Sequence, residues 1–174
     1  MTSPHQLRPA TLDDAPMLAR LHVQAWAETY PGILPPEEIA RRTYAIRLAQ
    51  WIAQINAGST RIFTIPDYGF VQFGPQRDEA LTAQGYAEEL YALYLLQAGQ
   101  GQGMGRALFD AGWAEAAFTC MVLDGNLRAC RFYERTGARL LRTFDDHIGE
   151  TPTRERLYGW PAPITKIDPA PHQS

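Results

Sequence analysis

The sequence predicts an α/β fold in a chain of 174 residues, which is long enough for one domain with a sizeable core. Residues 88–95 have the alternating, aromatic-rich pattern of a strand, and four alternating glycines follow them. Met104, Ala107, Leu108 and Ala111 then recur at helical spacing. The central unit is therefore predicted to be strand, glycine loop and helix.

The other elements are predicted from the same periodicities and from turn residues. Before the central unit we expect an edge strand at 6–8, a helix from 15 to about 30, a helix from 35 to about 57, and strands at 61–65 and 70–73. Residues 76–85 read as a loop, either a solvated connection or a cover for a substrate. After the unit we expect a strand at 118–123, a helix at 126–136, and strands at 138–144 and 155–158 separated by residues 145–149.

Two further expectations concern the faces of the strand at 88–95 and the end of the chain. Within residues 88–95, simple alternation puts Glu89, Tyr91, Leu93 and Leu95 on one face of the strand and Glu88, Leu90, Ala92 and Tyr94 on the other. Residues 161–174 contain four prolines and show no periodicity, so we expect a single domain over 1–160 followed by a proline-rich tail.

Composition excludes several classes of protein. Hydrophobic residues make up 45% and charged residues 20% of the chain, as in ordinary globular proteins. The formal net charge of −3 argues against a nucleic-acid partner. Apolar runs are too short for a membrane span or signal peptide. Cys120 and Cys130 lack metal-ligand spacing, so we expect no metal and two reduced, buried thiols in a cytoplasmic protein.

The glycine loop predicts a site for a phosphate-bearing ligand, because backbone N–H groups and a helix N-terminus can converge on one anion there. Glycines at 99, 101, 103 and 105 do not fit G-x-G-x-x-G, and no lysine follows them as in G-x-x-x-x-G-K-[ST]. The remaining pattern is Q-x-x-G-x-G, made by Gln100, Gly103 and Gly105. It resembles the coenzyme A pyrophosphate loop of the GNAT superfamily of N-acetyltransferases.

A second segment strengthens this resemblance. Asn126, Ala129, Cys130 and Tyr133 share one face of the predicted helix. The pattern N-x-x-A-x-x-F-Y-E-x-x-G resembles the other GNAT motif, and this resemblance implies that Asn126 contacts the coenzyme while Tyr133 lies near its sulfur.

The resemblance implies a mixed, strongly twisted sheet of about seven strands, with helices on both faces and acetyl-CoA entering where two central strands separate. Leu93, Tyr94 and Leu95 would pair with the pantetheine arm. The pyrophosphate would be held by Gln100, Gly101, Gln102, Gly103, Met104, Gly105 and Arg106. Many relatives have proline where this chain has Gln97, so we expect a more mobile loop here.

The implied reaction moves an acetyl group to a primary amine by direct attack. Tyr133 would donate a hydrogen bond to the departing thiolate. Glu89 would act as the base through water, with a solvated carboxylate at the strand end as the alternative. The rival function is a non-catalytic acyl-CoA-binding module, and a nucleotide-binding protein is disfavoured by the glycine spacing.

Three residues are candidates for the acceptor site. Trp26 and Tyr30 belong to a segment that borders this site in GNAT proteins, although core packing is an equally good interpretation of two large aromatic residues. His147, with Asp145 and Asp146, would attract a cationic acceptor or belong to a polar hairpin. The acceptor and the oligomeric state are not encoded in any motif, although a homodimer is compatible with the resemblance.

Overall fold

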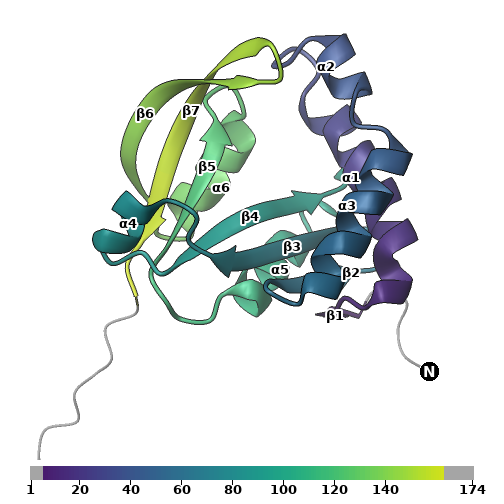
Figure 1. Cartoon of the computed structure of the whole chain (residues 1–174), viewed down its shortest axis with the longest axis horizontal. Helices are drawn as coiled ribbons and strands as arrows, with labels where there is room; N and C mark the ends of the chain where they lie inside the picture. Colours follow the sequence, from purple (N-terminus) through teal and green to yellow (C-terminus); the bar gives the residue numbers. More distant parts are fainter. Residues whose placement is uncertain (1–5, 163–174) are drawn as a thin grey trace, which may run out of the picture.

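The computed structural model describes residues 6–162, which form a mixed seven-stranded sheet with helices on both faces (Figure 1). The strands are β1 (Arg8–Pro9), β2 (Arg61–Ile65), β3 (Gly69–Pro75), β4 (Glu88–Leu95), β5 (Phe118–Leu123), β6 (Arg139–Ile148) and β7 (Thr151–Trp160). Their order across the sheet is β1-β2-β3-β4-β5-β7-β6. Among the described strands, β4 and β5 form the one parallel pair. This architecture confirms the predicted fold class.

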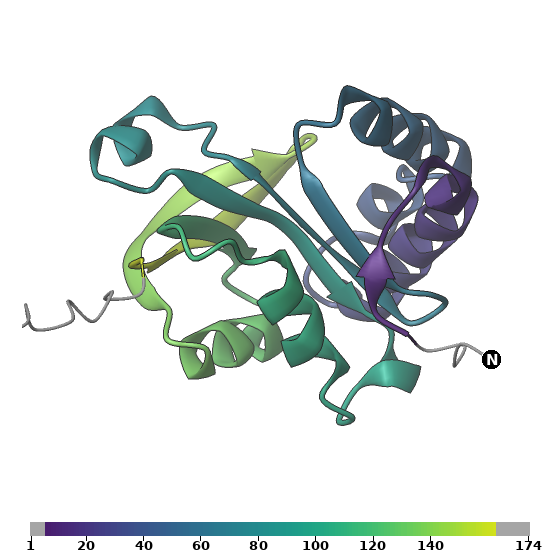
Figure 2. The same cartoon turned by 90° about the horizontal axis from the view of Figure 1, so that it is seen from below.

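Helices cover the two faces of the sheet separately. They are α1 (Ala15–Thr29), α2 (Pro36–Ala40), α3 (Tyr44–Ala57), α4 (Glu79–Ala83), α5 (Met104–Gly112) and α6 (Leu127–Arg135), with short 3-10 turns η1 (Leu12–Asp14) and η2 (Gln97–Gly99). Figure 2 shows α1 and α3 on one side of the sheet and α5 and α6 on the other. We call these the α1/α3 face and the α5/α6 face.

Each face has its own hydrophobic core. On the α1/α3 face, Leu18, Trp51 and Phe70 are completely or almost completely buried. On the α5/α6 face, Phe109 and Phe118 pack with Trp160, whose ring stacks on Phe118 at 4.4 Å between centroids. Burial of these large rings stabilises both layers and fixes the sheet between them.

Two boundaries in the first half differ from the sequence-based expectation. The single helix expected from 35 to about 57 is two helices, because Thr43 caps a new one: its side chain accepts a hydrogen bond from the Ile46 N–H. The expected loop at 76–85 contains α4, which starts where the Asp78 carboxylate accepts from the N–H groups of Ala80 and Leu81. The side chains of Thr43 and Asp78, which cap α3 and α4, therefore start helices at positions that the sequence periodicity does not reveal.

The final hairpin is longer than expected. Residues 145–148 belong to β6 rather than to a connection, and Asp145 lies opposite Arg154 with a 2.8 Å ion pair. The strand β6 is mostly exposed at the edge of the sheet, and polar residues occupy positions 145–147, so no apolar alternation reveals its continuation past 144. The expected strand limits at 144 and 155 were therefore wrong.

The β4 strand contains an irregularity that changes which residues share a face. Gln72 pairs with Ala92 and Phe73 pairs with Leu90, so Tyr91 is an extra residue in the ladder. Leu90, Leu93 and Leu95 consequently contact the α5/α6 core, whereas Ala92 and Tyr94 contact the α1/α3 core. The expected grouping of Tyr91 with Leu93 and Leu95 was wrong, because a bulge shifts the period of two.

Two further observations concern the ends of the chain and membranes. The proline-rich tail was predicted for 161–174, and residues 163–174 of it lie outside the described residues.

Among the helices that are described, none has the length and apolar character needed to cross a membrane.

Candidate active site

The two central strands separate and leave a cavity between them. Glu88 pairs with Phe118 and Glu89 with Thr119, and beyond this point β4 and β5 diverge, as Figure 1 shows. The cavity has a volume of about 370 Å³. Its walls come from the end of β4, the glycine loop and α6, so the structure brings the two sequence motifs together around one space. We call it the coenzyme cavity.

The glycine loop lines one end of the coenzyme cavity. Gly101 and Gly103 have φ angles of +76° and +77°, a region that L side chains rarely adopt, and Gly103 is the N-cap of α5. The helical hydrogen bonds of α5 begin with the one from the Ala107 N–H to the Gly103 carbonyl. The N–H groups that precede Ala107 in the helix therefore have no partners within it. Several N–H donors and a helix N-terminus are thus available for an anion.

Hydrogen bonds hold this loop in place. The Gln100 amide donates to the Leu95 carbonyl at 3.0 Å, and the Gln102 amide donates to the Ala98 carbonyl at 2.9 Å. The Gln97 backbone N–H donates to Glu28 on α1 at 2.8 Å. Proline at position 97 could not make this last bond, because proline has no N–H. Gln97 therefore gives the loop one contact with α1 that proline could not make, and the expected mobility of the loop stays a prediction.

The helix α6 forms the opposite wall. Asn126, Ala129 and Tyr133 all line the coenzyme cavity, while Cys130 of the same helical face is buried beneath it. Asn126 also caps α6, because its side-chain oxygen accepts from the Ala129 N–H at 3.2 Å. Three of the four residues predicted to share a face therefore line the same cavity.

Three arginines on the cavity wall add positive charge. Arg106, Arg128 and Arg135 line the coenzyme cavity and are exposed to solvent. The sequence motifs included Arg106 but missed Arg128 and Arg135, although both lie on the helix that carries the second motif. Their proximity to the glycine loop depends on the packing of α6 and makes this end of the cavity suited to phosphate groups.

Tyr133 lies deep in the coenzyme cavity. Its ring packs against Phe132, Tyr158 and Trp160, with centroids 5.5, 6.4 and 5.5 Å away. Burial raises its pKa well above 10, and the neighbouring Cys120 thiol adds to the shift. The phenol is therefore a neutral hydrogen-bond donor at physiological pH.

Glu89 is buried and fully engaged in an ion pair. Its two carboxylate oxygens accept from Arg77 Nε at 3.0 Å and Nη2 at 2.5 Å. This side-on contact uses the planar edge of the guanidinium, which also lies 4.1 Å from the centroid of the Tyr91 ring. Sequence reasoning did not find Arg77, which lies twelve residues away along the chain.

A second carboxylate, which the sequence did not single out, is also buried. Glu155 on β7 pairs with Leu123 at the end of β5, and its Oε1 accepts from the Thr153 hydroxyl at 3.1 Å. Burial raises its pKa above the usual carboxyl value, while the Thr153 hydrogen bond opposes that change. Only the pairing of β7 with β5 brings this residue towards the site.

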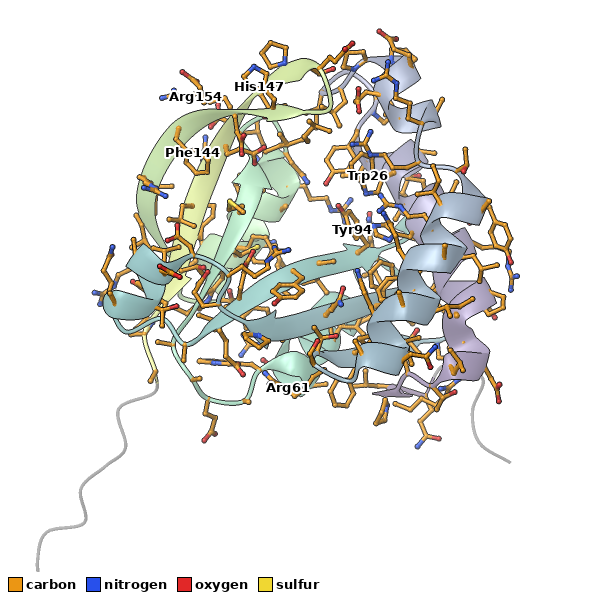
Figure 3. The ribbon with its side chains drawn as sticks, viewed as in Figure 1. Trp26, Arg61, Tyr94, Phe144, His147 and Arg154 are labelled. Carbon is orange, nitrogen blue, oxygen red and sulfur yellow. The ribbon has the colours of Figure 1, made fainter. Side chains whose placement is uncertain are left out.

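The predicted acceptor residues divide between two positions. Tyr30 is buried, meets Trp26 edge-to-face with 4.7 Å between ring centroids, and places its hydroxyl 2.7 Å from that of Tyr94. Trp26 and His147 both line a shallow depression between α1, α3 and the β6–β7 hairpin. Figure 3 shows Trp26 and Tyr94 on the α1/α3 side and His147 on the hairpin. Because Asp145 is paired with Arg154, its charge is already compensated.

A second cavity of about 240 Å³ lies on the α1/α3 face of β4. It is lined by His22, Trp26, Arg47, Arg77, Tyr91 and Tyr94, among others. Because Trp26 is one of the predicted acceptor residues, we call this space the acceptor cavity. Tyr94 lines both this space and the coenzyme cavity. His22 and Arg47 carry no motif signal, since helical packing and not sequence spacing places them here.

Comparison with known proteins agrees with this geometry. Residues 22–138 match the Acetyltransferase (GNAT) family. The chain is 37% identical over 166 residues to YuaI of Bacillus subtilis, an uncharacterized N-acetyltransferase, covering 89% of this chain and 92% of that protein.

Solved structures share the fold at lower identity. An N-acetyltransferase from Staphylococcus aureus Mu50 is 17% identical, with a TM-score of 0.65 over 90% of this chain and 98% of that one. Arabidopsis thaliana NAA60 in complex with acetyl-CoA is 16% identical, with a TM-score of 0.64 over 89% and 97%. Family match, relative and fold agree, and the chain belongs to the GNAT family of acetyltransferases.

Proposed function

We propose that this enzyme transfers the acetyl group of acetyl-CoA to a primary amine by direct attack in a ternary complex. The observation that carries the proposal is the cavity between the diverging strands β4 and β5, which has N–H donors and arginines at one end and Tyr133 deep inside. A chain of this family needs such a space for the coenzyme, and NAA60 of similar fold is known with acetyl-CoA.

In this proposal the pyrophosphate rests on the N–H groups from Gly101 to Arg106, with Gln100 and Gln102 shaping the loop. The pantetheine arm runs along Leu93, Tyr94 and Leu95, where β4 is no longer paired with β5. Met104 and Gly105 begin α5, and Asn126 faces the coenzyme from α6. A Cβ at Gly105 would meet protein atoms only at 3.6 Å or more, which leaves room for a ligand.

The chemistry needs a neutral amine, because only its lone pair can attack the thioester carbon. The new C–N bond forms as the C–S bond breaks, the amine proton passes to a base, and the coenzyme leaves as a thiolate. Tyr133 donates a hydrogen bond to that sulfur. Complete proton transfer from a tyrosine to a thiolate is uphill by about 2 kcal/mol at ordinary pKa values, and burial makes it less favourable still.

Direct attack is favoured over a covalent acetyl-enzyme by the state of Cys120. Its thiol is 5% exposed, and burial raises its pKa to about 12. A thiol with that pKa supplies almost no thiolate at neutral pH. Cys120 is therefore a poor nucleophile, although it lies beside Tyr133.

We further propose Glu89 as the base, acting through a water molecule at the edge of the acceptor cavity. Arg77 occupies both of its oxygens, so a proton can reach Glu89 only when one arm of this ion pair opens. Trp26 and His147 would border the acceptor, with Tyr30 positioning Trp26 and Tyr94 from behind.

Thiol release from acetyl-CoA in the presence of different amines tests the function. The panel contains amino acids, polyamines, aminoglycosides and short peptides, and blank hydrolysis is measured in parallel. Release that depends on one class of amine, with acetylated product, is the expected result. Acetyl-CoA binding without release by any amine would favour the rival function, a non-catalytic acyl-CoA-binding module.

A further inference from the structure

Arg47 on α3 is an arginine with an unused hydrogen-bonding edge inside the acceptor cavity. Its side chain is nearly buried, with 8% of the residue exposed. Nη1 donates to the Gln50 side chain at 3.1 Å. Nε and Nη2 are buried and have no hydrogen-bond acceptor among residues 6–162. An unsatisfied buried charge is costly, so a protein rarely retains one without a use.

The neighbouring Arg77 shows what this edge binds. Arg77 also lines the acceptor cavity, and it uses Nε and Nη2 to hold both oxygens of the Glu89 carboxylate. These two nitrogens form the planar edge that matches a carboxylate. Arg47 has the same two nitrogens, but residues 6–162 supply no carboxylate to them.

The acids near Arg47 are already committed. Glu89 is held by Arg77, and Glu38 is held by Arg41 and Arg42. His22 borders the same cavity, and burial together with the charge of Arg47 lowers its pKa to about 3. The imidazole is therefore neutral and does not compete for an anion. The cavity has a net positive character that no carboxylate in the described part of the chain compensates.

The guanidinium of Arg47 is also held in position. It lies 5.0 Å from the centroid of the Trp26 ring, and that of Arg42 lies 4.7 Å from the same centroid. Contact with the aromatic ring occupies the face of a guanidinium, so a hydrogen-bonding ligand must meet its edge. Pre-positioning of this kind reduces the entropy lost when a ligand binds.

We propose that the acceptor is a primary amine that also carries a carboxylate, and that the Nε/Nη2 edge of Arg47 binds this carboxylate. The inference rests on the proposed transfer reaction and specifies its substrate class. With the carboxylate at Arg47, the amine extends towards Tyr94, which borders both cavities. Amino acids fit this description, whereas polyamines and aminoglycosides do not.

Matched acceptors test the inference without altering the protein. The kcat/KM for thiol release is measured for several amino acids and for their carboxamides. The carboxamide has the less basic amine, so more of it is free base at pH 7, and a preference for the acid must come from recognition. We expect the acids to be favoured about 100-fold, the usual worth of a paired charged hydrogen bond. Carboxamides or polyamines used equally well would overturn the inference and leave the transfer reaction intact.

Variants locate the recognition. Arg47→Gln should lower kcat/KM for the acids about 100-fold, mainly through KM, and change that for the carboxamides less than about threefold. Arg47→Lys should recover part of the kcat/KM that Arg47→Gln loses for the acids, because lysine restores the positive charge but lacks the planar Nε/Nη2 edge. Arg42→Gln is the matched control: Arg42 also lies over Trp26, but its N–H groups bind Glu38, so the preference for acids should persist. If Arg47→Gln and Arg42→Gln reduced the preference for acids equally, the assignment of the carboxylate site to Arg47 would be contradicted.

A binding measurement separates the two proposals. Acetyl-CoA affinity and circular dichroism first show that each variant is folded. If no amine supports thiol release, the transfer reaction has failed, and amino acids are titrated calorimetrically into the CoA-loaded protein. If the unaltered protein binds amino acids and Arg47→Gln abolishes this binding, the carboxylate site is supported even without a transfer reaction. Absence of binding to the unaltered protein would overturn it.

Discussion

The hydroxyl of Tyr30 lies 2.7 Å from the hydroxyl of Tyr94, which ties the end of α1 to β4 beside both cavities. Burial raises the pKa of both phenols, so each hydroxyl remains neutral and hydrogen-bonded. Tyr30 had two interpretations from the sequence, and the contact gives it a role in positioning the strand that the coenzyme is proposed to follow.

Removing this hydrogen bond should cost stability. Tyr30→Phe leaves the buried Tyr94 hydroxyl without this partner, and we expect the free energy of unfolding to fall by about 1–2 kcal/mol. Chemical denaturation measures the change. In the double variant, which carries both Tyr30→Phe and Tyr94→Phe, the loss of unfolding free energy should be smaller than the sum of the losses in the two single variants. A loss equal to that sum would show that the two hydroxyls are not coupled.

Tyr133→Phe should lower kcat about 10- to 100-fold while leaving acetyl-CoA affinity nearly unchanged, because it removes the proposed donor to the thiolate but keeps the ring. Steady-state kinetics and calorimetry measure the two quantities. Tyr158→Phe is the control, since Tyr158 belongs to the same aromatic cluster but donates to Glu134 outside the cavity wall. Equal turnover for Tyr133→Phe and the unaltered enzyme would remove Tyr133 from the mechanism.

Glu89 and its partner Arg77 should respond differently to substitution. Glu89→Gln should lower kcat at least about 100-fold, because the proposed base is lost. Arg77→Gln keeps the carboxylate and should chiefly lower stability, by about 1–2 kcal/mol, since Arg77 is exposed and the buried charge loses its partner. Glu155→Gln removes the other buried carboxylate. A larger kcat loss in Glu155→Gln than in Glu89→Gln would transfer the role of base to Glu155.

Gly103→Ala should weaken acetyl-CoA binding as well as stability. A side chain at φ +77° costs about 1 kcal/mol, and relief of that strain would move the N–H groups proposed to hold the pyrophosphate. Gly137→Ala is the control, because Gly137 ends α6 at φ +98° away from the cavity wall. Both variants should lose stability in thermal unfolding, but only Gly103→Ala should raise the Kd for acetyl-CoA.

His22 should make the protein less stable in mild acid. Its pKa falls from 6.5 to about 3 on folding, so the unfolded chain binds a proton that the folded chain does not. Stability is therefore complete above pH 6.5 and is lost as pH falls from 6.5 towards 3, by about 2 kcal/mol at pH 5. Denaturation at several pH values measures the slope, and His22→Gln should flatten it.

The sequence alone was sufficient for local features. Period-two and helical patterns identified the strands flanking the motifs, and the glycine spacing identified a loop that adopts positive φ at Gly101 and Gly103. Spacing on one helix also placed Asn126 and Tyr133 on a shared face. These features depend on residues that are close along the chain, where backbone geometry is almost independent of the remaining fold.

Tertiary structure decided everything that depends on distant segments. The bulge at Tyr91 put Leu90 on the same face as Leu93, because pairing with β3 and not the count along β4 sets the side. Arg77 reached Glu89 across a loop, and Arg47 entered the acceptor cavity through the packing of α3. Such contacts arise from three-dimensional packing, which leaves no periodic signal in the sequence. The motifs of this acetyltransferase could therefore be read from its residues, while the cavity proposed for its acceptor appeared only with the fold.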